Sequence, residues 1–364
     1  MPRPRTVYRG KRKYGWIITA VATVLAVLIV LSVWLFYFLQ RYIVYDKDGL
    51  RLDLSAQKES ILQSDSTEEP GHVPSLPSVD VEIVVDEKDY SEVTTSAGTD
   101  LQAMRAVFIP AAELTENTLK YYSGGLGDFN ALVLELKGPD GYLHWHSGVS
   151  AADSFAVNGS LEIADYLSVL KEKGIYLTAQ LSMLTDAAMA VRNSPLALKN
   201  SATGAALTDG KGSYWLDPYS EGTRSYYLAL LTELKALGFD EILCSDFVCP
   251  DNEYLQFSLT MTQVPTPASA LSSLAMWLRE QADAVGIKLS VQMESDALRS
   301  TEVLRGQDPT LLFRVFDRVA VESDFDHLSG DITAMAEALG QDDENRALLI
   351  TADYAPARES YIVK

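Results

Sequence analysis

From about residue 102 onward, short β-branched apolar runs alternate with amphipathic stretches of helical period. Such runs, each followed by a helix, are typical of parallel strands buried on both faces. We interpret as strands Arg105–Ile109, Ala131–Leu136, Ile175–Leu181, Glu241–Phe247, Lys288–Met293, Arg318–Val321 and Ala347–Thr351. The alternation predicts an α/β fold, and seven such units over about 260 residues predict a (β/α)8 barrel of the TIM type.

Capping residues indicate where four of the helices begin and end, because serine often caps a helix N-terminus and glycine often ends a helix. The expected helices are 160–174, 220–238, 267–286 and 331–340. Only Tyr361–Val363 remains for the eighth strand, and no helix is expected before it. The barrel is therefore expected to be incomplete or irregular at its C-terminal end.

The N-terminal part contains 24 consecutive residues without a charge, from Trp16 to Leu39. A helix of that length rises about 36 Å and crosses a hydrocarbon core of about 30 Å. A cleaved signal peptide would have a shorter apolar region that ends in small residues, whereas this run ends in bulky aromatic ones. We expect one transmembrane helix over residues 16–39.

Charge predicts the orientation of that helix. Residues 1–15 carry six arginine and lysine residues and no acid, although the whole chain has a formal charge of −20. The positive-inside rule places this basic tail in the cytoplasm and the remaining acidic chain outside the cell membrane. So acidic an exterior excludes nucleic acid as a partner, because nucleic-acid binding needs a basic surface.

Two further regions separate the expected helix from the barrel. Residues 40–54 alternate around a turn that ends in Gly49, which predicts a juxtamembrane β-hairpin. Residues 55–101 are polar and rich in proline up to residue 78, which predicts a flexible linker with one strand at Val79–Asp86. Residues 102–364 then form the barrel domain.

Cys244 and Cys249 are the only cysteines, so the exported part is not a disulfide scaffold. They could pair only if the chain turns between them, because an extended span would hold them too far apart. Two buried free thiols are the alternative, and the sequence leaves both open.

Polar residues follow several of the expected strands, where TIM barrels carry their active groups. They are Glu135, Lys137, Gln180, Asp246, Glu294, Glu322, Asp324 and Asp353, and Trp215 and Asp217 lie in a loop before the helix of 220–238. Carboxylates beside aromatic rings suit glycoside chemistry, in which one acid protonates the leaving oxygen and a second carboxylate attacks or activates water.

Metal chemistry is disfavoured. His144 and His146 project to one face of an extended segment, but two ligands without a third are weak grounds for a metal site. The chain has four histidines and no His-x-x-x-His pair, which argues against a metal-dependent deacetylase or peptidase. We expect no metal and no cofactor.

The segment from about 105 to 260 resembles a bacterial family named "putative glycosyl hydrolase domain", whose members are often membrane-anchored. The resemblance lies, in order, in Asn130–Lys137, Asp140–Tyr142, Leu170–Leu177, Leu196–Lys199, Trp215–Tyr219 and Leu237–Ile242. It implies a TIM barrel distantly similar to the α-amylase group. It also implies that Asp246 is the nucleophile, Glu294 the general acid/base and Asp353 an assisting carboxylate.

The chain departs from that family at three places. The family usually carries Phe-Asp-Tyr-Val/Ile-Arg-Phe-Pro after the fourth strand, whereas the stretch Cys244–Pro250 has no arginine. Glu135 replaces the usual aspartate of the second strand, and Gln180 stands where an arginine is common. The loss of two arginines would weaken the field that holds a nucleophile ionised and in place.

These observations lead to a hypothesis and an alternative. The chain is expected to be a membrane-anchored extracellular glycoside hydrolase-like protein that acts on a polysaccharide such as cell-wall glycan. Substrate binding and positioning are assigned to Glu135, Lys137, Gln180, Trp215, Asp217 and Asp353. The alternative is a catalytically inactive glycan-binding or envelope scaffold domain. The sugar, the linkage, the stereochemical outcome and the oligomeric state stay open.

Overall fold

The computed structural model describes residues 43–46, 49–52, 101–259, 265–340, 345–352 and 358–364, which fall into two compact units, 1–86 and 87–364. In the first unit, β1 (Ile43–Asp46) pairs antiparallel with β2 (Gly49–Leu52), where the sequence predicts a hairpin. The expected transmembrane helix, the linker and its strand at Val79–Asp86 lie outside the described residues. Within the described ranges, no helix combines the length and apolar character needed to cross a membrane.

The second unit is a closed barrel of eight parallel strands, which confirms the predicted TIM-type architecture. The strands are β3 (Arg105–Ile109), β4 (Ala131–Lys137), β5 (Tyr176–Ser182), β7 (Glu241–Ser245), β9 (Lys288–Met293), β10 (Arg318–Glu322), β11 (Ala347–Thr351) and β12 (Tyr361–Val363). They follow one another around the ring in chain order. The strand β7 ends two residues earlier than expected because Asp246 takes a left-handed conformation with φ of 49°.

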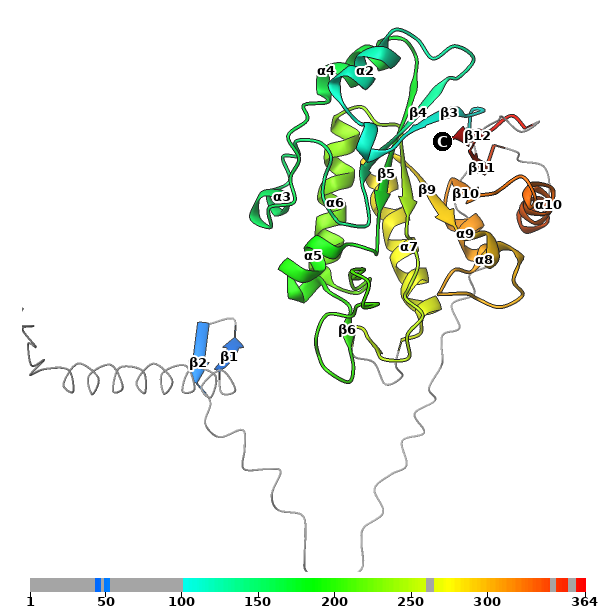
Figure 1. Cartoon of the computed structure of the whole chain (residues 1–364). Coiled ribbons are helices and arrows are strands. Elements are labelled where there is room, and N and C mark those ends of the chain that lie inside the picture. Colours follow the sequence, from blue (N-terminus) through cyan, green and yellow to red (C-terminus); the bar gives the residue numbers. More distant parts are fainter. Residues whose placement is uncertain (1–42, 47–48, 53–100, 260–264, 341–344, 353–357) are drawn as a thin grey trace, which may run out of the picture. The chain divides into compact units, whose positions relative to one another are not determined.

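The three-residue strand β12 closes the ring. It pairs in parallel with β11 on one side and with β3 on the other (Figure 1), with Ile362 opposite both Ile350 and Ala106. The expectation of an incomplete barrel is therefore wrong, because three residues are enough for a strand that hydrogen-bonds along both edges. The expected irregularity is present, since residue 352 and residues 358–360 are not helical.

Helices surround the strands (Figure 1). They are α2 (Glu116–Ser123), α3 (Ser150–Ser154), α4 (Ala164–Glu172), α5 (Ala187–Arg192), α6 (Glu221–Ala236), α7 (Pro267–Val285), α8 (Ser295–Arg299), α9 (Pro309–Val315) and α10 (Leu328–Leu339). Short pieces complete the list: η2 (Ala111–Glu113), η3 (Ser194–Leu196), β6 (Lys199–Asn200) and β8 (Leu255–Gln256).

The predicted helix ends are correct where a capping residue is present in the structure. Ser220 caps α6 by accepting a hydrogen bond from the Thr223 amide, and α7 ends at Gly286 with φ of 76°. By contrast, α4 begins at Ala164 and not at Ser160. The cause is the neighbouring extended segment, because the His146 amide donates to the Leu161 carbonyl oxygen at 2.9 Å and so keeps residue 161 out of the helix.

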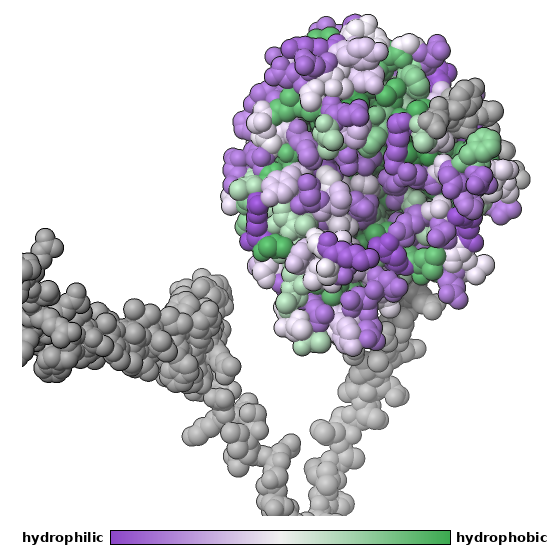
Figure 2. All heavy atoms as spheres, viewed as in Figure 1, coloured by the Kyte–Doolittle hydropathy of each residue, from purple (hydrophilic) through white to green (hydrophobic). Residues whose placement is uncertain are grey.

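Apolar side chains fill two regions. One cluster fills the barrel interior with mostly small or branched residues, and the other packs the outer face of the strands against the helices. Strands buried on both faces explain the nearly continuous apolar runs of the sequence. On the face that Figure 2 draws, hydrophilic side chains predominate and apolar ones are scattered between them.

Both cysteines are free and buried, which selects the second alternative left by the sequence. Burial raises the pKa of both thiols, that of Cys249 to about 12. The thiolate is the reactive form. We therefore expect iodoacetamide at about pH 8 to leave both cysteines of the native protein unmodified and to alkylate both after denaturation, as read by mass spectrometry. Alkylation of either cysteine in the native protein would contradict this assignment.

Candidate active site

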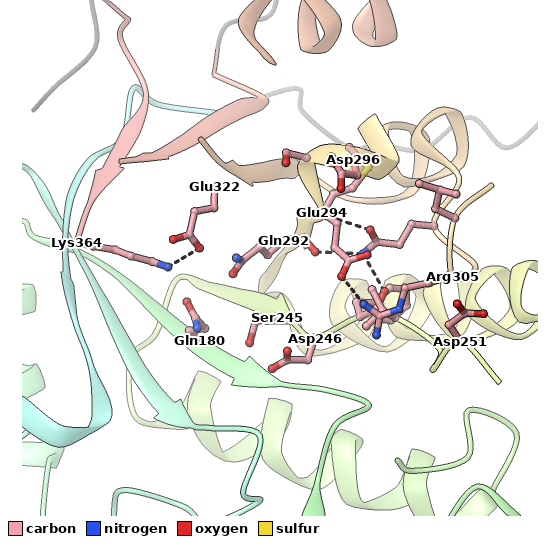
Figure 3. Close-up of a pocket in the computed structure, with 16 residues that line it drawn as sticks. Gln180, Ser245, Asp246, Asp251, Gln292, Glu294, Asp296, Arg305, Glu322 and Lys364 are labelled. Atoms are coloured by element: carbon pink, nitrogen blue, oxygen red, sulfur yellow. Dashed lines mark hydrogen bonds and ion pairs between the residues drawn. The ribbon is translucent and has the colours of Figure 1, made fainter. Parts of the chain in front are cut away.

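A pocket of about 830 Å³ lies at the carboxyl ends of four barrel strands and next to the C-terminal residue (Figure 3). Its polar lining residues come from β5, β7, β9, β10 and the loops after them, and from Lys364 after β12. They are Gln180, Ser245, Asp246, Asp251, Gln292, Glu294, Ser295, Asp296, Arg305, Gln307, Glu322 and Lys364. Of the eight predicted site residues, the structure places Gln180, Asp246 and Glu294 in this pocket.

Asp246 and Glu294 directly follow β7 and β9, which are neighbours in the barrel. The left-handed backbone of Asp246 is uncommon for a residue other than glycine, and such conformations cluster at functional sites. The adjoining loop after β5 holds it, because the Leu184 amide donates to the Asp246 carbonyl oxygen at 3.3 Å. Parallel strands thus bring two residues 48 positions apart to one rim.

Gln307 fixes the two strand ends relative to each other. It is fully buried, and its Oε1 accepts a hydrogen bond from the Glu294 amide at 3.0 Å. Its Nε2 donates to the Phe247 carbonyl oxygen, also at 3.0 Å. One amide side chain therefore bridges the residue after Asp246 and the backbone of Glu294. This bridge limits how far the two candidate catalytic residues can separate.

Arg305 is a lining residue that sequence reasoning missed. Its guanidinium forms an ion pair with the Glu294 carboxylate, and its Nε donates to the Cys249 carbonyl oxygen at 3.0 Å. The Cys249 amide donates back to the Arg305 carbonyl oxygen at 2.9 Å. An arginine thus reaches the arginine-free stretch after β7 from another loop. The sequence offered only an arginine before Gly306, which does not reveal a contact 56 positions away.

The opposite side of the pocket holds a second ion pair, between Lys364 Nζ and Glu322 Oε2 at 2.6 Å (Figure 3). The lining contains five carboxylates and only these two cations, Arg305 and Lys364. Each cation is already paired with one of the carboxylates. The pocket therefore carries an excess of negative charge.

Glu135 and Lys137 do not line the pocket. Glu135 Oε2 accepts a hydrogen bond from the Ala111 amide at 2.8 Å and so holds the turn after β3. The Lys137 ammonium is fully buried, where it pairs with Asp186 at 2.9 Å and donates to the Ser182 carbonyl oxygen. The register of β4 shifts between these two residues. Glu135 and Lys137 each hold a loop in place, and Lys137 is inaccessible to a substrate.

Trp215 and Asp217 are also turned into the protein, with 6% and 2% of their surface exposed. Trp215 pairs with Thr185 in an antiparallel bridge, and it lines a separate cavity of about 310 Å³ that shares Asp251 and Arg305 with the main pocket. Burial explains why its ring does not stand free as a stacking platform. Asp353, the remaining predicted residue, lies outside the described residues.

Asp217 accepts hydrogen bonds from the amides of Tyr219 and Ser258, which ties the loop before α6 to the loop after β8. His146 of the sequence's histidine pair bonds Glu162 at 2.6 Å. In the ranges that the structure describes, no three His, Cys, Asp or Glu side chains are arranged to hold a metal ion.

The sequence matches the profile of a family described as "Putative glycosyl hydrolase domain" over residues 108–316, more than half of the chain. The chain belongs to this family. The match covers Asp246, Glu294 and Arg305 and ends before β10. No curated protein matches the chain.

Several solved structures are similar to this chain. The PgaB (BpsB) glycoside hydrolase domain from Bordetella bronchiseptica is 13% identical and has a TM-score of 0.53, with 72% of this chain and 94% of that chain covered. A hypothetical protein from Ruminiclostridium thermocellum is 21% identical, with a TM-score of 0.44 and coverage of 51% and 96%. A Flavobacterium johnsoniae chitobiase is 14% identical, with a TM-score of 0.47 and coverage of 69% and 38%.

Asp217 is expected to make stability depend on pH. Burial raises the pKa of its carboxyl, against the two backbone donors. Its contribution to stability is therefore fully present below the unfolded pKa of about 3.9 and is lost as pH rises through the folded value. Relative to Asp217→Asn, the wild type should lose free energy of unfolding as pH rises above about 4, as measured by urea denaturation.

Asp209→Asn is the matched control, because the Ser213 hydroxyl lowers the pKa of the exposed Asp209 carboxyl. When the wild type is compared with Asp209→Asn, the pH dependence is reversed. The wild type should lose free energy of unfolding relative to that variant as pH falls. A wild type that gains stability over Asp217→Asn with rising pH would contradict the burial of Asp217.

Proposed function

We propose that this chain is a membrane-anchored, extracellular glycoside hydrolase-like protein that acts on a polysaccharide, with cell-wall glycan as the favoured class. One observation carries the proposal: Asp246 and Glu294 follow adjacent barrel strands and line one pocket of about 830 Å³. That volume lies within the range of pockets that hold small ligands or a few sugar units. Family membership supports the glycan, and the uncharged run at residues 16–39 supports the anchor.

The two carboxyl groups would divide the reaction between them. Glu294 would give its proton to the glycosidic oxygen while the bond from that oxygen to the anomeric carbon breaks. Asp246 would either bond to the anomeric carbon, or take a proton from the water that attacks it. In the first case water then releases the sugar from Asp246 and returns a proton to Glu294. The separation of the carboxyls on a bound substrate decides between the two routes.

A specific observation supports the non-catalytic alternative as well. Glu294 is held by Arg305, which is itself fixed to Cys249. Glu294 has to leave or share this ion pair before it can approach a glycosidic oxygen. A protein that only binds glycans would keep the pair. The two functions therefore differ in whether the Arg305–Glu294 contact opens in the complex.

Substitution of the two carboxylates distinguishes enzyme from binder. If the chain is an enzyme, the wild type releases reducing ends from wall polysaccharide, and Asp246→Asn and Glu294→Gln each lower that rate by about 100-fold or more. Both variants should retain glycan binding, because the groups act in the transition state. Glu172→Gln, an exposed site on α4, is the control and should keep full activity. Binding without release by the wild type establishes the scaffold function, and neither binding nor release refutes the proposal.

Topology provides an independent test. Because six cationic residues precede the uncharged span, protease added to intact cells should remove a tag at the C-terminus and spare one at the N-terminus. Detergent-permeabilised cells are the control, in which both tags are lost. Protection of the C-terminal tag in intact cells would refute the extracellular placement.

A further inference from the structure

We propose that the pocket selects glycans whose sugars carry protonated amines in place of N-acetyl or hydroxyl groups. This inference rests on the proposed function, since it names the substrate class of the same site. It is carried by three features of the lining: unpaired carboxylates, buried polar side chains without a partner, and the absence of an exposed aromatic ring.

The first feature is the charge that stays unpaired. Of the five lining carboxylates, Glu294 pairs with Arg305, Glu322 with Lys364, and Asp296 with Arg299 at 3.1 Å. Asp246 and Asp251 form no ion pair with any residue in the described ranges. A neutral sugar would shield these two carboxylates from water without supplying a positive charge. A sugar ammonium supplies that charge, and an anionic sugar would be repelled.

The second feature is a pair of largely buried polar side chains beside Asp246. Gln180 and Ser245 are 9% and 6% exposed and line the pocket, yet neither side chain makes a hydrogen bond within the described residues. Figure 3 shows them with Asp246 along one side of the pocket. Their polar atoms face the pocket, so a ligand that displaces water from them has to supply hydrogen bonds in its place. An ammonium has three N–H donors, which match Gln180 Oε1, Ser245 Oγ and the Asp246 carboxylate.

The third feature concerns aromatic rings. Phe247 is the only aromatic residue among the described lining residues, and it is fully buried. Apolar and aromatic surfaces usually provide much of the affinity in small-molecule sites. Without an exposed ring to stack on a sugar, more of the affinity of this pocket comes from charge and hydrogen bonds. This composition favours a cationic sugar over a neutral one.

Three β-1,4-linked hexasaccharides test the inference, because glucosamine, N-acetylglucosamine and glucose hexamers differ only in the group at C2. The full-length chain in mild detergent is titrated with each by calorimetry at about pH 6, where the amine is protonated. We expect the glucosamine hexamer to bind at least about 10-fold more tightly than the other two. Added salt should shrink this preference, because it screens ion pairs.

Matched variants show where the preference arises. Asp251→Asn and Gln180→Leu should each weaken binding of the glucosamine hexamer several-fold. Asp165→Asn and Glu172→Gln remove one charge each from exposed positions on α4 and should leave it unchanged, which excludes attraction by the acidic protein as a whole. Circular dichroism checks that each variant is folded.

The outcomes separate this inference from the proposed function. Equal affinity for the three hexamers, a preference for the glucose or N-acetylglucosamine hexamer, or no binding of the glucosamine hexamer overturns the amine selectivity. So does a preference that only the α4 variants reduce. Binding or cleavage of a neutral or acetylated glycan would still support the proposed function, which fails only if no glycan is bound or cleaved.

Discussion

The guanidinium of Arg318 organises the amino-terminal end of the barrel. It is buried at the start of β10 and pairs with Glu241 at the start of β7 at 3.2 Å. It also donates to the carbonyl oxygens of Gln102 at 2.9 Å and of Asn345, which precede β3 and β11. A buried ion pair is stable only when hydrogen bonds satisfy its remaining groups. Glu241 meets that condition by accepting from Tyr176 and Ser290, so one network joins strands on opposite sides of the ring.

That network connects the strands at the amino-terminal end of the barrel. At the carboxyl end, the contacts between strands are made by the loops. There the strands are connected by single side chains. Gln307 joins the ends of β7 and β9, and Arg305 joins Glu294 to Cys249. The division agrees with the general rule for TIM barrels, in which one end provides stability and the other provides function. It also explains why Asp246 can keep an uncommon backbone conformation without threatening the fold.

The position of the arginine connects the mechanism to the proposed selectivity. The family pattern places an arginine near the nucleophile, whereas this chain supplies Arg305 from a distant loop to Glu294. Within the described residues, Asp246 therefore forms no ion pair with a cation of the protein. A positively charged substrate would compensate for the missing cation beside Asp246. Under the proposed amine selectivity the departure from the family pattern is a change in ligand, whereas under the scaffold alternative it is a loss of catalysis.

The sequence by itself determined the barrel. Burial on both faces gave each strand a recognisable apolar run, so β3, β9, β11 and β12 begin and end as predicted, and the caps at Ser220 and Gly286 set two helix ends. These features depend on neighbouring residues, which a sequence displays directly. Asp246, Glu294 and Gln180 followed from the rule that strand ends converge.

Only the tertiary structure decided which polar residues at those ends share a pocket. Glu135 and Lys137 lie at a strand end as Asp246 does, yet they bond to the turn after β3 and to Asp186 inside the protein. Asp217, in the loop before α6, bonds loop backbone amides. The roles of Arg305 and Gln307 depend on where two loops meet in space. A side chain's partner across 50 or more positions is set by the path of the chain, because local periodicity fixes direction within an element and not the contacts between loops.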